Sequence, residues 1–161
     1  LIEVPVVAAL RGACLGGGVQ LAMTADIRIA ADDLKLGIPA VSLGLVYPLD
    51  AVTKIITLAG PSTAKHLLIG GAPYDAATAC AKRLVDEVVP ADQLVEHATG
   101  FAERVAKYPP DTVRTYKRII DDYTAGTEIE AIEEMRSRAN RAGELIDRLA
   151  QVHRERKQKA S

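Results

Sequence analysis

The sequence predicts an α/β domain followed by a helical carboxyl-terminal region, on three observations. Short β-branched runs alternate with glycine turns and helical segments over residues 1–91, a pattern typical of α/β layers. From residue 92 to residue 161 the strand signals disappear, and apolar residues recur at helical spacing. With 161 residues and 48% hydrophobic side chains, the chain is long enough to bury a core. We therefore predict a core over residues 1–91 and a helical region over residues 92–161.

The chain opens on a strand pattern. Residues 4–10 form an apolar, β-branched run closed by Arg11-Gly12, which favours a fully buried strand. The glycine run at residues 16–18 then predicts a sharp turn, and residues 19–23 have helical composition. Because the sequence starts with Leu1 rather than methionine and enters this strand at once, we expect a piece of a longer protein.

Two further strands are predicted at residues 27–31 and 34–36, which alternate like half-buried strands around an acidic turn. A last strand is predicted at residues 84–89. The sequence between these strands is punctuated by glycine and proline, which mark turns and the ends of helices.

Helix start signals fall between the strands. Asp50 is placed to cap a helix of about residues 51–58, and Gly60-Pro61 begins another that ends at residues 70–71. Asp75 is placed to cap a third helix, because an aspartate side chain accepts a hydrogen bond from the free amides of the first turn.

Composition excludes several classes of partner. Lys and Arg number 20 against 21 Asp and Glu, so the chain has almost no net field to attract nucleic acid or an anionic membrane. Cys14 and Cys80 lie far apart and form no CxxC pair, which favours a reduced, cytoplasmic setting. No run approaches the roughly 20 apolar residues that span a bilayer, and no basic-then-apolar leader opens the sequence.

The segment from Pro5 to Asp26, PVVAALRGACLGGGVQLAMTAD, resembles the signature stretch of the crotonase superfamily, the enoyl-CoA hydratase/isomerase family. Strand, glycine run, helix and closing aspartate come in the family's order, and shorter matches continue to about residue 90. The resemblance implies a spiral of ββα units followed by helices used in trimer packing. It also implies a homotrimer or a dimer of trimers, and a chain longer at its amino end.

By this resemblance, Gly17 supplies one of two oxyanion-hole amides, and the amino-terminal half supplies the other and much of the CoA-binding surface. Glycine lets a backbone N–H approach a thioester oxygen closely, and such donors stabilise developing negative charge. Leu15 and Gly16 are the implied neighbouring contacts to CoA, and Lys157 in the basic tail would reach the CoA phosphates. The alternative for the glycines is a packing turn without a ligand. A nucleotide loop fits poorly, because the spacing matches neither GxGxxG nor GxxxxGK[ST].

The pattern departs from the family where acid and base are needed. Gln20 and Ala40 stand where the family usually carries two glutamates, and neither side chain exchanges a proton near neutral pH. Tyr47 matches in position a tyrosine of methylmalonyl-CoA decarboxylases in this superfamily; packing is the alternative role. Asp50 is the carboxylate nearest to that of related isomerases and dehalogenases, with helix capping as the alternative.

The resemblance therefore implies an acyl-CoA enzyme that stabilises a thioester enolate and is not a standard hydratase. Decarboxylation, isomerisation or another non-hydratase step would fit, with Gly17, Tyr47 and Asp50 as candidate catalytic residues. The alternative is a catalytically silent member of the superfamily that binds acyl-CoA or a partner subunit. No metal or redox cofactor is implied, and CoA enters as part of the substrate.

Overall fold

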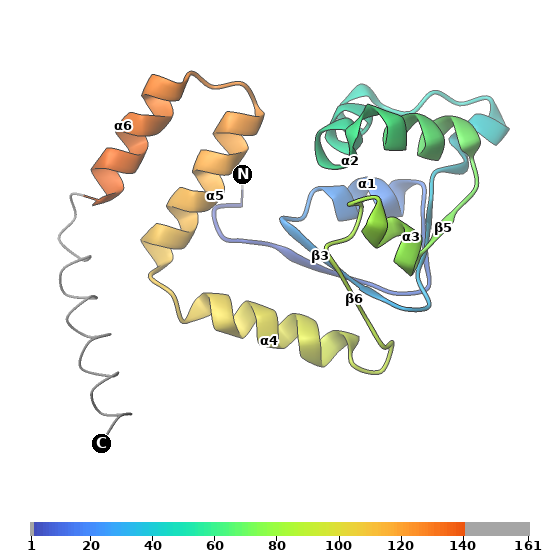
Figure 1. Ribbon diagram of the computed structural model, residues 1–161, viewed down its shortest axis with the longest axis horizontal. Coiled ribbons are helices and arrows are strands. Elements are labelled where there is room, and N and C mark those ends of the chain that lie inside the picture. Colours follow the sequence, from blue (N-terminus) through green and yellow to red (C-terminus); the bar gives the residue numbers. More distant parts are fainter. Residues whose placement is uncertain (1, 141–161) are drawn as a thin grey trace. The chain divides into compact units, whose positions relative to one another are not determined.

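The computed structural model describes residues 2–140, and the chain divides into two compact units, Leu1–Lys107 and Tyr108–Ser161. Figure 1 shows the strands gathered in the first unit, with helices around them. The division follows helix α4 (Leu94–Ala106), which packs against β1 and β3 of the first unit. It therefore comes later in the chain than the boundary predicted at residues 91 and 92.

The first unit contains both sheets. Its strands are β1 (Val7–Leu10), β2 (Ala13–Leu15), β3 (Ile27–Ala31), β4 (Lys35–Gly37), β5 (Tyr74–Asp75) and β6 (Glu87–Val89). Its helices are α1 (Gly17–Met23), the 3-10 helix η1 (Pro39–Leu43), α2 (Leu49–Gly70), α3 (Ala76–Ala81) and α4. The mixed α/β architecture predicted from the sequence is confirmed.

The strands form two small sheets, in which all neighbouring strands except β4 and β5 are parallel. One sheet has the order β1-β3-β6, all parallel, with Val7 opposite Ile27 and Ala31 opposite Val89. The other has the order β2-β4-β5, in which β2 and β4 are parallel and β5 is antiparallel to β4. The first four strands thus alternate between the two sheets, whereas β5 stays in the sheet of β4 and β6 returns to the sheet of β1 and β3.

Strand β3 separates two apolar layers because successive side chains of a strand point to opposite faces. Ile29 and Ala31 pack with Leu94 and Ala98 of α4 on one face. Ala30 belongs to the larger core on the other face, which α1, α2 and α3 help to build. Figure 1 shows the same arrangement, with α4 on one side of β3 and β6 and α1, α2 and α3 on the opposite side.

Two predictions about burial are wrong for one reason, the position of each strand in its sheet. The run over residues 4–10 was predicted to be a fully buried strand, but β1 covers only Val7–Leu10, lies at the edge of its sheet and exposes Ala9. Ile27–Ala31 was predicted to be half-buried, but β3 is the central strand, and its four residues from Arg28 on are buried. Periodicity along one segment does not reveal which strand becomes central.

The helix signals of the first unit are largely confirmed. The Asp75 carboxylate accepts a hydrogen bond from the Thr78 amide at 2.8 Å and so caps α3 as predicted. Helix α2 is interrupted at Gly60, whose φ of 80° and ψ of 163° are not helical, so two helical stretches meet there as predicted. The Gly60 backbone needs a conformation that other residues rarely adopt.

The second unit, in its described part, consists of α5 (Pro110–Thr124) and α6 (Ile129–Asn140), which pack on each other. The prediction that strands end before this region is confirmed for the residues that the structure describes. Within residues 2–140, every helix is too short or too polar to cross a bilayer.

Candidate functional site

The glycine turn between β2 and α1 is the centre of the candidate site. Gly16 adopts φ 53° and ψ −117°, a backbone conformation that glycine reaches without strain. Its N–H donates a 2.9 Å hydrogen bond to the carbonyl of Gly37, at the end of β4. This bond joins the end of one strand to the end of its parallel neighbour, where Leu15 pairs with Gly37.

The amide of Gly17, the first residue of α1, is free. The Gly16 carbonyl accepts from the amides of Val19 and Gln20, at 3.0 and 3.2 Å, which leaves the two preceding amides outside the helical ladder. Among residues 2–140, no acceptor bonds the N–H of Gly17 or of Gly18. A Cβ built on Gly17 meets no heavy atom within 4 Å, so the space beside it is open. The donor predicted for an oxyanion is thus unpaired and exposed.

Gln20 and Ala40 lie on two different elements: α1, which begins at the turn, and η1, which follows Gly37 in sequence. Gln20 lies one helical turn after Gly17 on α1 and is half-buried. Ala40 lies in η1, three residues after Gly37, and packs partly buried against the core. Neither offers a group that takes or gives a proton near neutral pH. The two positions therefore contribute no acid or base to the turn.

Tyr47 lies between η1 and α2 and is half-buried against the main core. Its hydroxyl is covered and has no hydrogen-bond partner among the described residues. Burial, and then the charge of nearby Cys14, raises the pKa of Tyr47, so the phenol remains protonated at neutral pH. Within residues 2–140 the hydroxyl is a donor without an acceptor, which is uncommon for a buried polar group.

Asp50 does not cap α2, and that alternative reading is wrong. The helix begins at Leu49 with Pro48 as its N-cap, so Asp50 lies inside the first turn rather than before it. Pro48 ends the extended segment with ψ 141°, and the chain turns helical one step earlier than the sequence signal predicts. The Asp50 side chain is exposed. An acid in the first turn still interacts favourably with the helix dipole.

Of the three predicted CoA contacts, Leu15 and Gly16 lie among the described residues. Leu15 is 44% exposed at the end of β2, and Gly16 follows it in the turn, so the two lie together beside Gly17. Lys157 lies outside the described residues.

Gly37 has a role in the turn that sequence reasoning missed. Besides holding Gly16 through its carbonyl, it is buried against the backbone of Pro73: a Cβ built on Gly37 would lie 2.9 Å from the Pro73 Cα. The GIP sequence at residues 37–39 indicates a turn, but its partners come from segments far along the chain. No local signal identifies them.

We predict that Gly37→Ala destabilises the fold by about 1–3 kcal/mol, because the added methyl forces two backbone segments apart. Chemical denaturation of the variant and the wild type measures the difference. Gly100→Ala is the matched control: Gly100 lies in α4 with nothing within 4 Å of its built Cβ. Alanine there should raise stability by roughly 0.5–1 kcal/mol, as in any exposed helix interior. Equal stability of Gly37→Ala and wild type would contradict the close approach to Pro73.

Comparisons with known proteins agree on one family for this chain. The enoyl-CoA hydratase/isomerase family model matches residues 1–150. The chain is 36% identical over 121 residues to "Probable enoyl-CoA hydratase EchA17" of Mycobacterium tuberculosis, covering 75% of this chain and 46% of that protein. It is 38% identical over 120 residues to "Probable enoyl-CoA hydratase echA17" of Mycobacterium avium, covering 74% and 47%. The chain thus spans about half the length of the curated relatives it matches.

Solved structures agree with this assignment. An enoyl-CoA hydratase/carnithine racemase from Magnetospirillum magneticum matches with a TM-score of 0.89 and 32% identity, over 95% of this chain and 58% of that one. A putative enoyl-CoA hydratase from Thermobifida fusca, solved in complex with CoA, matches with a TM-score of 0.75 and 28% identity, over 92% and 55%. The chain belongs to the enoyl-CoA hydratase/isomerase family, and so to the crotonase superfamily that its signature stretch predicts.

Proposed function

We propose that this chain forms part of an acyl-CoA enzyme in which the Gly17 N–H polarises a thioester carbonyl and stabilises the enolate derived from it. The observation that supports the proposal most is the free amide of Gly17, which has no acceptor among residues 2–140 and faces open space. A fixed donor of this kind is strongest where negative charge develops on an oxygen, because no reorganisation is needed at that moment. A second amide would come from outside this chain.

The reaction we propose is not water addition. Hydration needs a base to activate water and an acid to deliver a proton, and Gln20 and Ala40 supply neither. Loss of CO₂ from an acyl-CoA with a carboxylate on its α-carbon, such as methylmalonyl-CoA, leaves the electron pair of the broken bond as a thioester enolate and needs no base. Decarboxylation therefore fits these residues, whereas isomerisation would need Asp50 or a group outside the chain. Leu15, Gly16 and Lys157 are the proposed CoA contacts, and CoA enters as part of the substrate.

A catalytically silent acyl-CoA-binding protein is the second candidate. The covered hydroxyl of Tyr47 and the absence of glutamate at residues 20 and 40 favour it. Titrating the full-length protein with crotonyl-CoA and methylmalonyl-CoA, with the thioester followed by mass, separates the two candidates. Turnover of methylmalonyl-CoA without hydration of crotonyl-CoA supports the enzyme, whereas saturable binding with no turnover of a wide acyl panel supports the binding protein.

The proposed partner, besides acyl-CoA, is a further copy of the same chain in a homotrimer or a dimer of trimers. Helix α5 supports this proposal, because it exposes Tyr116, Ile120 and Tyr123 by 64%, 61% and 66%. Large apolar side chains on one helix are typical of a face that a partner covers. Light scattering of the full-length protein tests it, and a monomeric mass at micromolar concentration would exclude it.

Tyr47→Phe separates packing from chemistry. We predict that the variant is as stable as the wild type or more stable by up to about 1 kcal/mol, because it removes a buried hydroxyl that has no hydrogen-bond partner in the described part of the chain. If the phenol donates to the substrate, turnover falls while stability does not.

Asp50→Asn is the parallel variant for the exposed carboxylate. Denaturation and acyl-CoA turnover are measured together, and unchanged turnover in both variants removes both residues from the site.

A further inference from the structure

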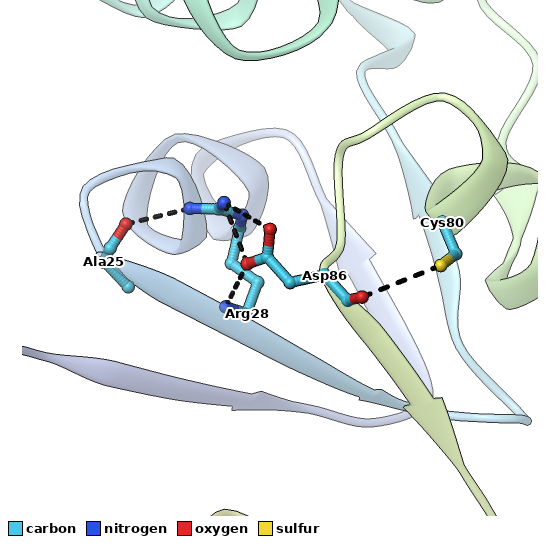
Figure 2. Close-up of polar contacts among 4 residues, drawn as sticks. All are labelled: Ala25, Arg28, Cys80 and Asp86. Atoms are coloured by element: carbon cyan, nitrogen blue, oxygen red, sulfur yellow. Dashed lines mark hydrogen bonds and ion pairs between the residues drawn. The ribbon is translucent and has the colours of Figure 1, made fainter. Parts of the chain in front are cut away.

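The carboxyl-terminal end of α1 is held by a buried arginine. Arg28, in β3, is only 3% exposed, and its Nη1 donates a 2.9 Å hydrogen bond to the carbonyl of Ala25. Ala25 lies two residues after the end of α1, in the connection to β3. Figure 2 shows the guanidinium reaching back from the strand to this carbonyl. The connection that ends α1 is thus tied to the sheet beneath it.

Asp86 fixes the arginine in turn. Its carboxylate accepts from the Arg28 backbone amide at 2.7 Å and lies 2.9 Å and 3.1 Å from Nη2. The Asp86 amide also donates to the Arg28 carbonyl at 2.9 Å. Figure 2 shows the carboxylate lying along both the backbone and the head of Arg28. A planar guanidinium held by two oxygens has little rotational freedom, so its bond to Ala25 has a fixed direction.

The opposite end of α1 is held independently. There the Gly16 amide donates to the Gly37 carbonyl, and the Gly16 carbonyl accepts from the amides of Val19 and Gln20. The helix between these attachments has seven residues, Gly17–Met23. A helix this short has little internal freedom, so the direction of its first amide depends on how both ends are fixed.

We propose that Arg28 and Asp86 are positioning residues for the Gly17 N–H. By holding Ala25, the pair sets the tilt of α1 and so the direction in which its first amide points. The inference rests on the proposed function, in which that amide meets a thioester oxygen. A displacement of about 1 Å at such a donor can cost about 10²-fold in rate.

The test uses acetyl-CoA labelled with ¹³C at its carbonyl and bound to the full-length protein. Isotope-edited infrared difference spectra report the carbonyl stretch, which moves to lower wavenumber when a donor polarises the bond. Asp86→Asn leaves the guanidinium without its counter-charge and should lose most of the wild-type shift. Glu87→Gln is the matched control: Glu87 lies next in sequence, but its carboxylate pairs with His97 of α4, 2.6 Å away, instead of with Arg28. Its shift should equal that of the wild type.

A second variant separates positioning from stability. Arg28→Met combined with Asp86→Asn removes the buried charge, so the double variant should be more stable than Asp86→Asn alone. Methionine at residue 28 cannot donate to the Ala25 carbonyl, so the shift of the acetyl-CoA carbonyl stretch should stay reduced. A shift that survives in Asp86→Asn, or that returns with stability in the double variant, would overturn the positioning role and leave the proposed function intact. Absence of any shift in the wild type would instead overturn the proposed function.

Discussion

Gly17→Pro is expected to lower the turnover of the acyl-CoA substrate by about 10²–10³-fold, because it removes a single oxyanion donor. The fold should survive the change. Proline is well accepted at the first position of a helix, where its missing N–H is not needed for the helical ladder. Gly17 occupies that position in α1, its amide has no acceptor among residues 2–140, and the space around it is open.

Gly17→Ala is the control for that experiment, since it adds a side chain at the same position and keeps the N–H. A built Cβ meets no protein atom within 4 Å, so the alanine variant should fold normally, and because it keeps the N–H it should lose less turnover than the proline variant. Steady-state kinetics and denaturation of both variants give the comparison. If the proline and alanine variants turn over substrate equally well, the amide is not a catalytic donor.

Restoring the missing carboxylates is expected to produce hydration. The double variant Gln20→Glu with Ala40→Glu should add water to crotonyl-CoA at least about 10²-fold faster than the wild type, because a positioned acid and base each contribute on that scale. Residue 20 lies three positions after Gly17 on the same side of α1, and residue 40 lies in the 3-10 helix that follows Gly37. Loss of the enoyl absorbance measures the rate.

The matched control keeps a side chain of the same size at residue 40 but removes its ability to exchange a proton. Gln20→Glu with Ala40→Gln has the same bulk as the double glutamate variant, but glutamine cannot act as acid or base near neutral pH. Equal rates for the two double variants would mean that residue 40 does not face the reacting carbon. That outcome would weaken the equivalence of Ala40 with a catalytic position.

Much of the first unit follows from local sequence. The segment from residue 27 to residue 31 predicts β3, the glycine run predicts the turn, and the Asp75 signal predicts the start of α3; all three are present. Strands β2 and β5, of three and two residues, were not predicted, because such short strands exist only through pairing with β4. Their cause is tertiary and leaves no periodic signal.

The candidate site, like the fold, was predictable only in part from the sequence. Gly17 was predicted as a donor from the signature stretch, and a free amide lies there. The two supports of α1 were not predicted: Gly37 is 21 residues from Gly16, and Asp86 is 58 residues from Arg28. A single sequence offers no pattern that joins an arginine in one strand to an aspartate before another. The hydrogen-bond donor of the turn is thus predictable from neighbouring residues, whereas the contacts that orient the turn come from distant segments of the sequence.

If the Gly17 N–H donates to a thioester oxygen, its NMR signal must respond to a bound acyl-CoA. With ¹⁵N-labelled glycine in the full-length protein, the amide resonances are followed by NMR as acetyl-CoA is added. We expect the Gly17 proton resonance to move downfield as the amide gains an acceptor, while the resonance of Gly126, whose amide already donates to the Tyr123 carbonyl at 3.1 Å, stays in place. Saturable binding of acetyl-CoA with no movement of the Gly17 resonance would contradict this donor role.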